Sequence, residues 1–480
     1  MITKFFDIII SIIEGTLRAG VEILESVLTN SKNKSYTAEF SSSWSLLSPW
    51  NKGFCLTGDK NLTLKLSYQN ALVIASTGLG KTTTILLPTL YSLKNSSVIV
   101  NDPSGENYLK SSGYLKEQGF IVKQLNFSKP DASSGFNPLL RANTSSEINK
   151  VSSMLISNAL GKNAKDPFWN NSAIQLLSML ISILKKQEPQ YQNLYTVRML
   201  LNKMGASPEQ VDKLFSQYAD ENLWDEYKSF LSADDKVISG TISTVKAALQ
   251  IFSDESVAKI TSTDNIDMQQ FRDKPTVLFI QNSVADQKYF STLTSIFFEQ
   301  FFSFVLSRFP KEEEQNIFFL IDEASSLNMP TLQLAVSNVR KHRAGILILY
   351  QTYDQCVHQY GKHEAEAIRS NCYVKMFFAG QNLETSRELE QILGRYEYRD
   401  KDDKKIIREL MTASEVRMLK ENKAIIIAGN RPPILAKLKP FYKNFRYSRL
   451  SQIPAPRTIS QTCFDSVPVL PLPAIEKVHE

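Results

Sequence analysis

Cysteine and histidine are scarce in this chain of 480 residues, and neither forms a metal-binding pattern. The four cysteines, Cys55, Cys356, Cys372 and Cys463, lie far apart, and the four histidines show no ligand spacing. Disulfide frameworks and structural zinc sites need several closely and regularly spaced ligands. We therefore expect a reduced, cytoplasmic protein without a disulfide framework.

A strong excess of charge is also missing. The 55 basic and 49 acidic residues leave a net charge of +6, with an isoelectric point near 8.8. This balance permits an acidic partner but is too weak to diagnose nucleic-acid binding by itself. The length allows two or three domains with sizeable cores, and no internal repeat is evident.

Long apolar runs are absent as well, even at the N-terminus, where acids interrupt an apolar stretch. No segment approaches the roughly 18 apolar residues that cross a bilayer, so we predict neither a transmembrane segment nor a signal peptide. Residues 1–30 instead predict an amphipathic helix. Because its acids outnumber its bases, a protein partner or the chain's own core is favoured over lipid. Its apolar face comprises Phe5, Phe6, Ile9, Ile12, Ile13, Leu17, Ile23 and Leu24.

What the sequence does contain is a phosphate-binding pattern, VIASTGLGKTTTILLPTL, between a buried strand and a helix-like stretch. The backbone N–H groups of such a loop converge on an anion, and the following helix adds partial positive charge. We expect Lys81 to neutralise the β- and γ-phosphates of ATP and the Thr82 hydroxyl to bind Mg²⁺. Alanine replaces the first glycine of the usual pattern. The predicted nucleotide-binding residues are Ala75, Ser76, Thr77, Gly78, Leu79, Gly80, Lys81, Thr82 and Thr83.

A second apolar strand, in NIFFLIDEASSL, ends in two adjacent acids, Asp322 and Glu323. Ligands of open α/β sheets sit at the carboxyl ends of strands, so these acids are expected to meet the phosphate-binding loop. Asp322 would hold the Mg²⁺ shell, and Glu323 would orient and deprotonate the attacking water. The alternative is that both acids cap a following helix.

Two further polar residues lie downstream in NVRKHRAGILILYQT. Gln351 ends a buried strand, where an amide is costly unless it is hydrogen-bonded, and is a candidate sensor of the γ-phosphate. Arg340 ends a helix-like stretch and would stabilise phosphoryl charge in the site of a neighbouring subunit. From the residues alone, a structural alternative remains open for each: Arg340 as a solvated surface arginine, and Gln351 as an edge glutamine whose hydrogen bonds are satisfied within the fold.

The arrangement of elements predicts an α/β fold with a mostly parallel sheet covered by helices on both faces. Strand patterns alternate with helical ones in residues 53–145 and 272–445, which we assign to a nucleotide-binding domain. Residues 146–271 show only helical patterns and predict an all-α insertion. From 446 to 480 prolines recur without an amphipathic period, which predicts an extended or disordered tail. The expected strands are Ala71–Ile74, Val98–Val100, Phe120–Phe127, Val277–Ile280, Ile317–Ile321, Ile346–Leu349, Val374–Phe378 and Ala424–Ile427, with short strands between Phe54 and Leu66.

Seven segments occur in the order found in the TraG-like family, the coupling ATPases of type IV secretion and conjugation. They are ASTGLGKTTTILLPTL, VIVNDPSGE, FNPL, DPFWNNSA, FLIDEASSL, RKHRAGILILYQT and QYG. The resemblance runs from about Gly53 to Asn444 and implies a RecA-like P-loop ATPase with an inserted all-α domain. It also implies that Arg340 is an arginine finger and Gln351 a sensor glutamine.

The same resemblance implies ATP and Mg²⁺ as cofactors, a hexameric ring, and transfer of a relaxase–DNA substrate, single-stranded, into a secretion channel. The chain departs from the family's commonest pattern because it lacks an N-terminal transmembrane hairpin. We therefore expect a cytoplasmic protein or one docked peripherally at the inner membrane, through residues 1–28. Two other functions stay open: a cytosolic hexameric DNA translocase, and an ATP-switched adaptor for protein substrates.

Three smaller motifs have mainly structural interpretations. Asp166 and Pro167 are suited to start a helix that buries Phe168 and Trp169. The Asn137-Pro138 pair favours a structural turn. Asp102 either contacts the nucleotide site or stabilises its own turn.

The segment 435–450, LAKLKPFYKNFRYSRL, has no acid and supports two interpretations. Alternating cations and rings suit single-stranded nucleic acid, which binds through its phosphates and stacked bases. The favoured alternative is a final edge strand with buried rings and solvated lysines. The residues concerned are Lys437, Lys439, Phe441, Tyr442, Lys443, Phe445, Arg446, Tyr447 and Arg449.

Overall fold

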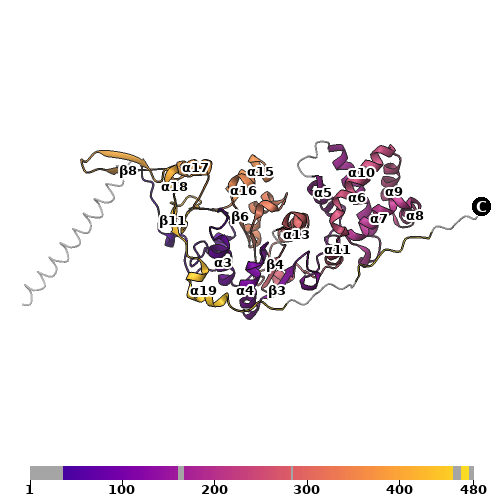
Figure 1. The fold of residues 1–480 in the computed structure, drawn as a ribbon, viewed down its shortest axis with the longest axis horizontal. Coiled ribbons are helices and arrows are strands. Elements are labelled where there is room, and N and C mark those ends of the chain that lie inside the picture. Colours follow the sequence, from indigo (N-terminus) through magenta and orange to yellow (C-terminus); the bar gives the residue numbers. More distant parts are fainter. Residues whose placement is uncertain (1–35, 161–166, 283–284, 458–465, 475–480) are drawn as a thin grey trace, which may run out of the picture.

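A nine-stranded sheet forms the centre of the protein in a computed structural model that describes residues 36–160, 167–282, 285–457 and 466–474 (Figure 1). Its strand order is β11-β10-β7-β1-β6-β5-β2-β4-β3. All neighbours from β7 to β3 pair in parallel, whereas β10 and β11 add antiparallel strands at one edge. The strands are β1 (Ala71–Ile74), β2 (Ser96–Asn101), β3 (Ile121–Leu125), β4 (Thr276–Ile280), β5 (Asn316–Ile321), β6 (Ala344–Tyr350), β7 (Val374–Phe378), β10 (Lys423–Ala428) and β11 (Ile434–Lys437).

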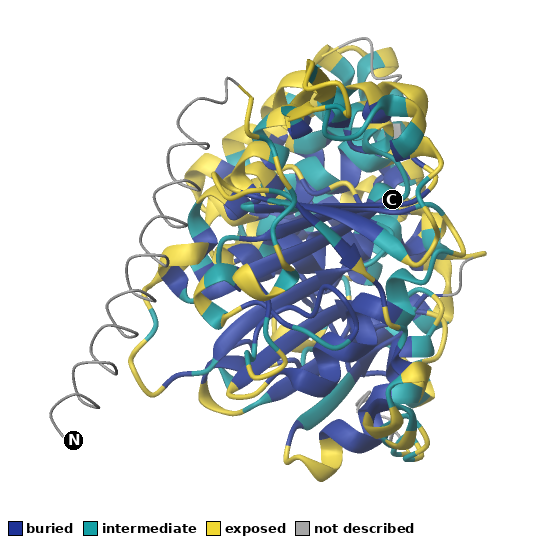
Figure 2. Cartoon of the chain, turned by 90° about the vertical axis from the view of Figure 1, so that its left-hand side faces the viewer, coloured by how far each residue is buried: buried dark blue, intermediate teal, exposed yellow. Residues whose placement is uncertain are grey.

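The predicted α/β class and all eight long-strand predictions are confirmed. Successive side chains of β1 enter different cores: Leu72 and Ile74 pack on one face, Ala71 and Val73 on the other. This alternation is the period of two that a pleated strand imposes. Figure 2 shows the resulting buried sheet between more exposed helices.

Helices cover both faces of the sheet. Helices α3, α4 and α19 contribute to one core, and α13 to α17 contribute to the other. Their bounds are α3 (Leu87–Ser92), α4 (Glu106–Glu117), α13 (Gln287–Ser307), α14 (Leu332–Asn338), α15 (Tyr353–Tyr360), α16 (Lys362–Asn371), α17 (Leu383–Leu393) and α19 (Phe445–Leu450). Short helices also occur at α2 (Leu64–Ser67), α12 (Gln270–Asp273) and α18 (Ala413–Arg417).

Between β3 and β4 the chain forms a group of helices at one end of the molecule (Figure 1). Their buried side chains belong to the same hydrophobic cluster as one face of the sheet. Because that core is continuous, the domain boundaries stay a prediction. The helices are α5 (Ser145–Leu160), α6 (Pro167–Leu184), α7 (Leu194–Ala206), α8 (Pro208–Tyr218), α9 (Glu221–Leu231), α10 (Asp235–Ala248) and α11 (Glu255–Thr261).

Several local predictions were wrong. The sequence suggests that Pro88 ends or kinks the helix after the phosphate-binding loop, but the chain stays helical through it, since the π-helical turn Thr82–Leu86 runs directly into α3 with Pro88 in its first turn. Between Phe54 and Leu66 only isolated bridges form, since the segment is occupied by turns and α2. Phe168 is 53% exposed because it lies in the first turn of α6, edge-on to Trp169.

The predictions for the two ends of the chain and for the start of α6 differ in outcome. Residues 1–30 and Asp166 lie outside the described residues. The segment from Arg446 is not extended at its start, because Asn444 caps α19 by accepting from the N–H groups of Arg446 and Tyr447. Within the described part of the chain, no helix combines the length and the apolar composition needed to cross a bilayer.

The sequence patterns missed a two-stranded hairpin, β8 (Arg395–Arg399) with β9 (Lys405–Glu409). It projects from the end of the molecule opposite the helical group (Figure 1). Ion pairs across the hairpin join Arg395 to Glu409 at 3.0 Å and Lys405 to Glu397 at 2.8 Å. The alternation of tyrosines and charges in β8 is a strand signal that sequence reasoning overlooked, whereas β9, Lys-Ile-Ile-Arg-Glu, has no such alternation.

The Asn137 and Asp102 side chains both stabilise their own surroundings. Asn137 donates to the Gln192 carbonyl at 2.8 Å and accepts from the Leu139 N–H, which confirms its structural role. Asp102 is buried and accepts from the Tyr108 N–H at 2.8 Å and from both the N–H and side chain of Asn107. It therefore fixes the first turn of α4 to the end of β2.

Asp102→Ala should lower the free energy of unfolding by about 2 kcal/mol, because three buried donors lose their acceptor. Urea denaturation of the full chain measures this. Asp131→Ala, at an exposed acid, is the matched control and should change the free energy of unfolding by less than about 0.5 kcal/mol. Equal stability of the two variants would contradict the capping role.

Candidate nucleotide-binding site

The predicted nucleotide-binding elements meet at one edge of the sheet. The phosphate-binding loop follows β1, Gln351 follows β6, and Asp322 with Glu323 follows β5. These strands are parallel neighbours in the order β1-β6-β5. Since the carboxyl ends of parallel strands share an edge, the loops converge as the sequence predicts.

The phosphate-binding loop, residues 75–83, is held open at its base by the sheet. The Ala75 N–H donates to the Tyr350 carbonyl at 3.0 Å, which extends the β1–β6 pairing by one residue. Gly78 and Gly80 have φ of +83° and +81°, conformations that favour glycine. Helical backbone resumes at Thr82 as a π-helical turn, Thr82–Leu86, leading into α3.

Lys81 donates from Nζ to the Ala75 carbonyl at 2.7 Å, within its own loop. This bond keeps the ammonium group over the loop, where a phosphate would exchange for the carbonyl. Ala75 is buried, whereas the remaining loop residues are exposed or partly exposed and are within reach of a ligand: Ser76, Thr77, Gly78, Leu79, Gly80, Lys81, Thr82 and Thr83.

Asp322 is held at the end of β5 by a neighbour that sequence reasoning missed. Asn101, the last residue of β2, donates to the Asp322 carbonyl at 2.5 Å. The pKa of Asp322 is raised to about 7, mainly by burial and with smaller contributions from the carboxylates of Glu323 and Asp102, while the Lys81 ammonium opposes the rise. A nearby cation strongly stabilises the charged form of a carboxyl group that is buried in this way.

Glu323 adopts a left-handed conformation with φ of +54°. This costs a non-glycine residue about 1 kcal/mol or more and places its side chain against the end of β6. There Gln351 donates from Nε2 to Glu323 Oε1. The N–H of Gln351 donates to Gln355 Oε1 of α15 at 3.0 Å, which fixes the sensor candidate itself.

Arg340 is not brought to these residues. It lies in a short 3₁₀ turn, Val339–His342, before β6, and its side chain is exposed. The seven residues of β6 separate it from Gln351 by about 20 Å. Within one chain, Arg340 therefore cannot contact Glu323.

A cavity of about 940 Å³ opens beside the phosphate-binding loop. One wall is formed by Gly78, Gly80 and Thr83, and the other by Lys439, Tyr442 and Lys443. Part of the segment 435–450, from Lys437 to Lys443, thus faces the nucleotide site. The edge strand is confirmed as β11 (Ile434–Lys437), but the expectation that its rings are buried holds only in part, since Tyr442 and Phe445 are 57% and 86% exposed. Sequence reasoning recognised this segment's cations and rings but did not place them here.

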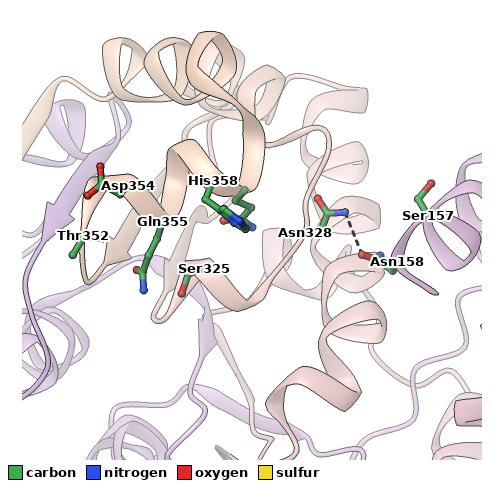
Figure 3. A pocket seen from close by; sticks show the side chains of 9 residues that line it. Ser157, Asn158, Ser325, Asn328, Thr352, Asp354, Gln355 and His358 are labelled. Atoms are coloured by element: carbon green, nitrogen blue, oxygen red, sulfur yellow. Dashed lines mark hydrogen bonds between the residues drawn. The ribbon is translucent and has the colours of Figure 1, made fainter. Parts of the chain in front are cut away.

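A second cavity, of about 730 Å³, lies between α15, α5 and the segment after Glu323 (Figure 3). Figure 3 shows a hydrogen bond across it, from Asn328 Nδ2 to Asn158 Oδ1 at 3.1 Å. On its other side Gln359 of α15 donates to the Ala324 carbonyl at 3.3 Å. The segment that follows Glu323 is therefore tied to both α15 and α5.

The donor set suits Mg²⁺ bound together with a phosphate. Among the described residues, no group of three or more histidine, cysteine and acidic side chains is placed to hold a metal ion. Thr82 and Asp322 are oxygen donors at the site, and Mg²⁺ is commonly held by one or two protein oxygens plus phosphates and water.

Comparison with known families gives a match over residues 19–464 to the type IV secretory system conjugative DNA transfer family. The chain belongs to this family. Its relatives include VirD4 from Rhizobium radiobacter, which is 24% identical over 83% of this chain and 62% of its own length. A conjugal transfer protein TraG from Escherichia coli is 22% identical over 68% of this chain and 55% of its own length. The chain thus spans about 60% of the curated relatives it matches.

Solved structures of the plasmid coupling protein TrwB share the fold. One, in complex with the GTP analogue GDPNP, gives a TM-score of 0.68 at 17% identity and covers 85% of this chain and 95% of its own. Another, in complex with ADP and Mg²⁺, gives 0.66 at 16% identity with the same coverage. These matches support a P-loop NTPase-like α/β fold.

Lys81→Ala should weaken binding of a fluorescent ATP analogue at least tenfold, because a charge-assisted phosphate contact is lost. Equilibrium fluorescence titration in the presence of Mg²⁺ checks this. Lys65→Ala changes an exposed lysine of α2, which lies near the amino ends of β1 and β6, away from the phosphate-binding loop. This variant should bind the analogue as the unmodified chain does. Equal affinities for the two variants would place the nucleotide elsewhere.

Proposed function

We propose that this protein is an ATP-hydrolysing coupling protein that recruits a relaxase–DNA substrate and drives its transfer into a type IV secretion channel. The observation that carries the proposal is the convergence of the phosphate-binding loop, the acid pair and Gln351 at one sheet edge. Membership of the conjugative DNA transfer family supports the substrate class. The proposal includes three partners, namely DNA, the relaxase and the channel. It also includes a homohexameric ring as the assembly.

In this mechanism ATP binds with its phosphates in the loop 75–83. Lys81 exchanges the Ala75 carbonyl for the β- and γ-phosphates. Thr82 and Asp322 would hold Mg²⁺, which supplies neutralisation of phosphate charge when bound. The likeness to TrwB structures holding nucleotides, in one case with Mg²⁺, supports these cofactors.

Glu323 orients the attacking water and accepts its proton. In the structure its Oε1 is occupied by Gln351, so water activation requires this hydrogen bond to be released or shared. Gln351 would then donate to the γ-phosphate or to the water, which makes the glutamine a sensor of bound nucleotide. The left-handed backbone at Glu323 keeps its carboxylate at the end of β6 while this exchange takes place.

We place the base and ribose of ATP in the 940 Å³ cavity, against Tyr442 and Lys443. Tyr442 is 57% exposed and is available to stack on a base. The cavity begins at the loop that holds the phosphates, so one ligand can span both. Lys443 is also one of the cations that the DNA interpretation uses. The two interpretations are compatible if the cations of the segment 435–450 face both ATP and DNA.

Glu323→Gln should retain ATP binding and lose hydrolysis by about 10²-fold or more, because the water loses its base. Lys81→Ala should lose both, and single-stranded DNA should stimulate hydrolysis by the unmodified chain but not by either of these two variants. Steady-state ATPase assays with and without DNA measure this, with Glu313→Gln as an exposed acid control. Normal turnover by Glu323→Gln would contradict the assignment of Glu323 as the base. A rate of hydrolysis that DNA does not change would favour the adaptor function.

Arg340→Ala rings should bind ATP but hydrolyse it at least 10²-fold more slowly, since the finger serves the next subunit's site. Lys81→Ala subunits retain Arg340, so mixing the two variants should restore part of the hydrolysis at the Arg340→Ala sites. The activity of mixed rings, verified by mass photometry, is the measurement. If mixing restores nothing, Arg340 is an ordinary surface residue.

A further inference from the structure

The C-terminal segment of the chain contacts both hydrophobic cores. Residues 451–457 follow α19 and lie on α4, where Tyr108 donates to the Pro456 carbonyl at 2.8 Å. Residues 466–474 lie beside α7 and α8 in the helical group (Figure 1), where Leu470 is buried. The described parts of the tail therefore reach both the sheet and the helical group.

The contact with α4 is close. Gly113 of α4 faces the tail so tightly that an added Cβ would lie 2.3 Å from the Pro454 carbonyl oxygen. Ile453 and Ala455 also pack against the core on this face. These contacts anchor the tail at one end.

The contact with α7 and α8 is looser. Of residues 466–474, only Leu470 is fully buried, and Val469 is 58% exposed. In the described structure this segment makes no backbone–backbone hydrogen bond, and its polar anchor is the Lys213 Nζ donation to the Ala474 carbonyl at 3.0 Å. A segment held by so few contacts leaves its site more readily than a strand that is hydrogen-bonded within a sheet.

The groove is also larger than the segment that occupies it. An open cavity of about 270 Å³ remains beside Leu470 and Leu472, lined by Tyr195, Met199 and Lys203 among others. A separate cavity of about 500 Å³ lies between α8 and α9 and is lined by Lys213 and Tyr227. Each volume far exceeds the space of about 30 Å³ that one water takes in the liquid.

We propose that the groove between α7 and α8 is a peptide-binding site for extended, apolar segments spaced by prolines, and that residues 466–474 are its internal ligand. Pro468, Pro471 and Pro473 fix φ and lower the entropy lost on binding, as in other recognition of extended proline-rich segments. The partner is a protein that presents a segment of this chemistry and fills the remaining cavities better. This inference does not depend on ATP hydrolysis.

The tail then acts as a tethered competitor. Because residues 466–474 belong to the same chain as the groove, their effective local concentration is on the order of millimolar, so a free peptide of the same sequence binds the intact chain poorly. A partner segment must bind substantially more tightly to displace the tail. Displacement would release the helical group from its link to α4.

A fluorescent peptide of residues 466–474 tests the proposal by anisotropy titration against the full chain. Leu470→Asp should release the tail and increase the affinity for the peptide at least tenfold over the unmodified chain. Ser466→Asp, at an exposed residue of the segment that does not line the cavity, is the matched control and should bind as weakly as the unmodified chain. Equal affinity in all three proteins would overturn the proposal.

Two further measurements keep the test decisive. Leu472→Asp, at a partly exposed residue of the same segment, is a second releasing variant in case Leu470→Asp does not fold. Adding Met199→Glu to a released variant, at a partly exposed position of the groove, should abolish peptide binding while leaving DNA-free ATPase activity unchanged. Peptide binding that survives Met199→Glu would place the site elsewhere and contradict the assignment.

Discussion

The parallel pairing of β1 with β6 and β7 is the constraint on which the rest of the site depends. β1 is buried on both faces, and its four residues are registered against Leu347–Tyr350 on one side and Val374–Phe377 on the other. This pairing fixes where the phosphate-binding loop leaves the sheet. Because β5 lies beyond β6, the same register places Gln351 between the loop and the acid pair, where it reaches Glu323.

The sheet was predictable because its strands are short, apolar and followed by polar residues with defined chemistry. Asp322, Glu323 and Gln351 were recognised from their positions at strand ends, and the parallel order then brought them together. Asn101 carried the same signal, a polar side chain ending a buried strand, but its partner is a backbone carbonyl that no local pattern reveals. Its role depends on β2 and β5 being neighbours, which is a property of the assembled sheet.

Other features depend on long-range packing in the same way. The cations and rings of 435–450 are visible in the sequence, but only the folded chain places Tyr442 and Lys443 opposite the phosphate-binding loop. The proline-containing tail carries no periodic signal, yet it lies on α4 and in the groove of α7 and α8. Sequence pattern reports local structure well, whereas contacts between segments hundreds of residues apart require the three-dimensional fold.

The central claim is that this sheet edge binds ATP through the loop 75–83. A cryo-EM structure of the full chain with Mg²⁺ and a non-hydrolysable ATP analogue tests it most directly. The account predicts that Lys81 Nζ leaves the Ala75 carbonyl for the phosphates, with the metal beside Thr82 and Asp322. A structure in which Lys81 keeps its bond to Ala75 while the analogue lies outside the loop would contradict the claim.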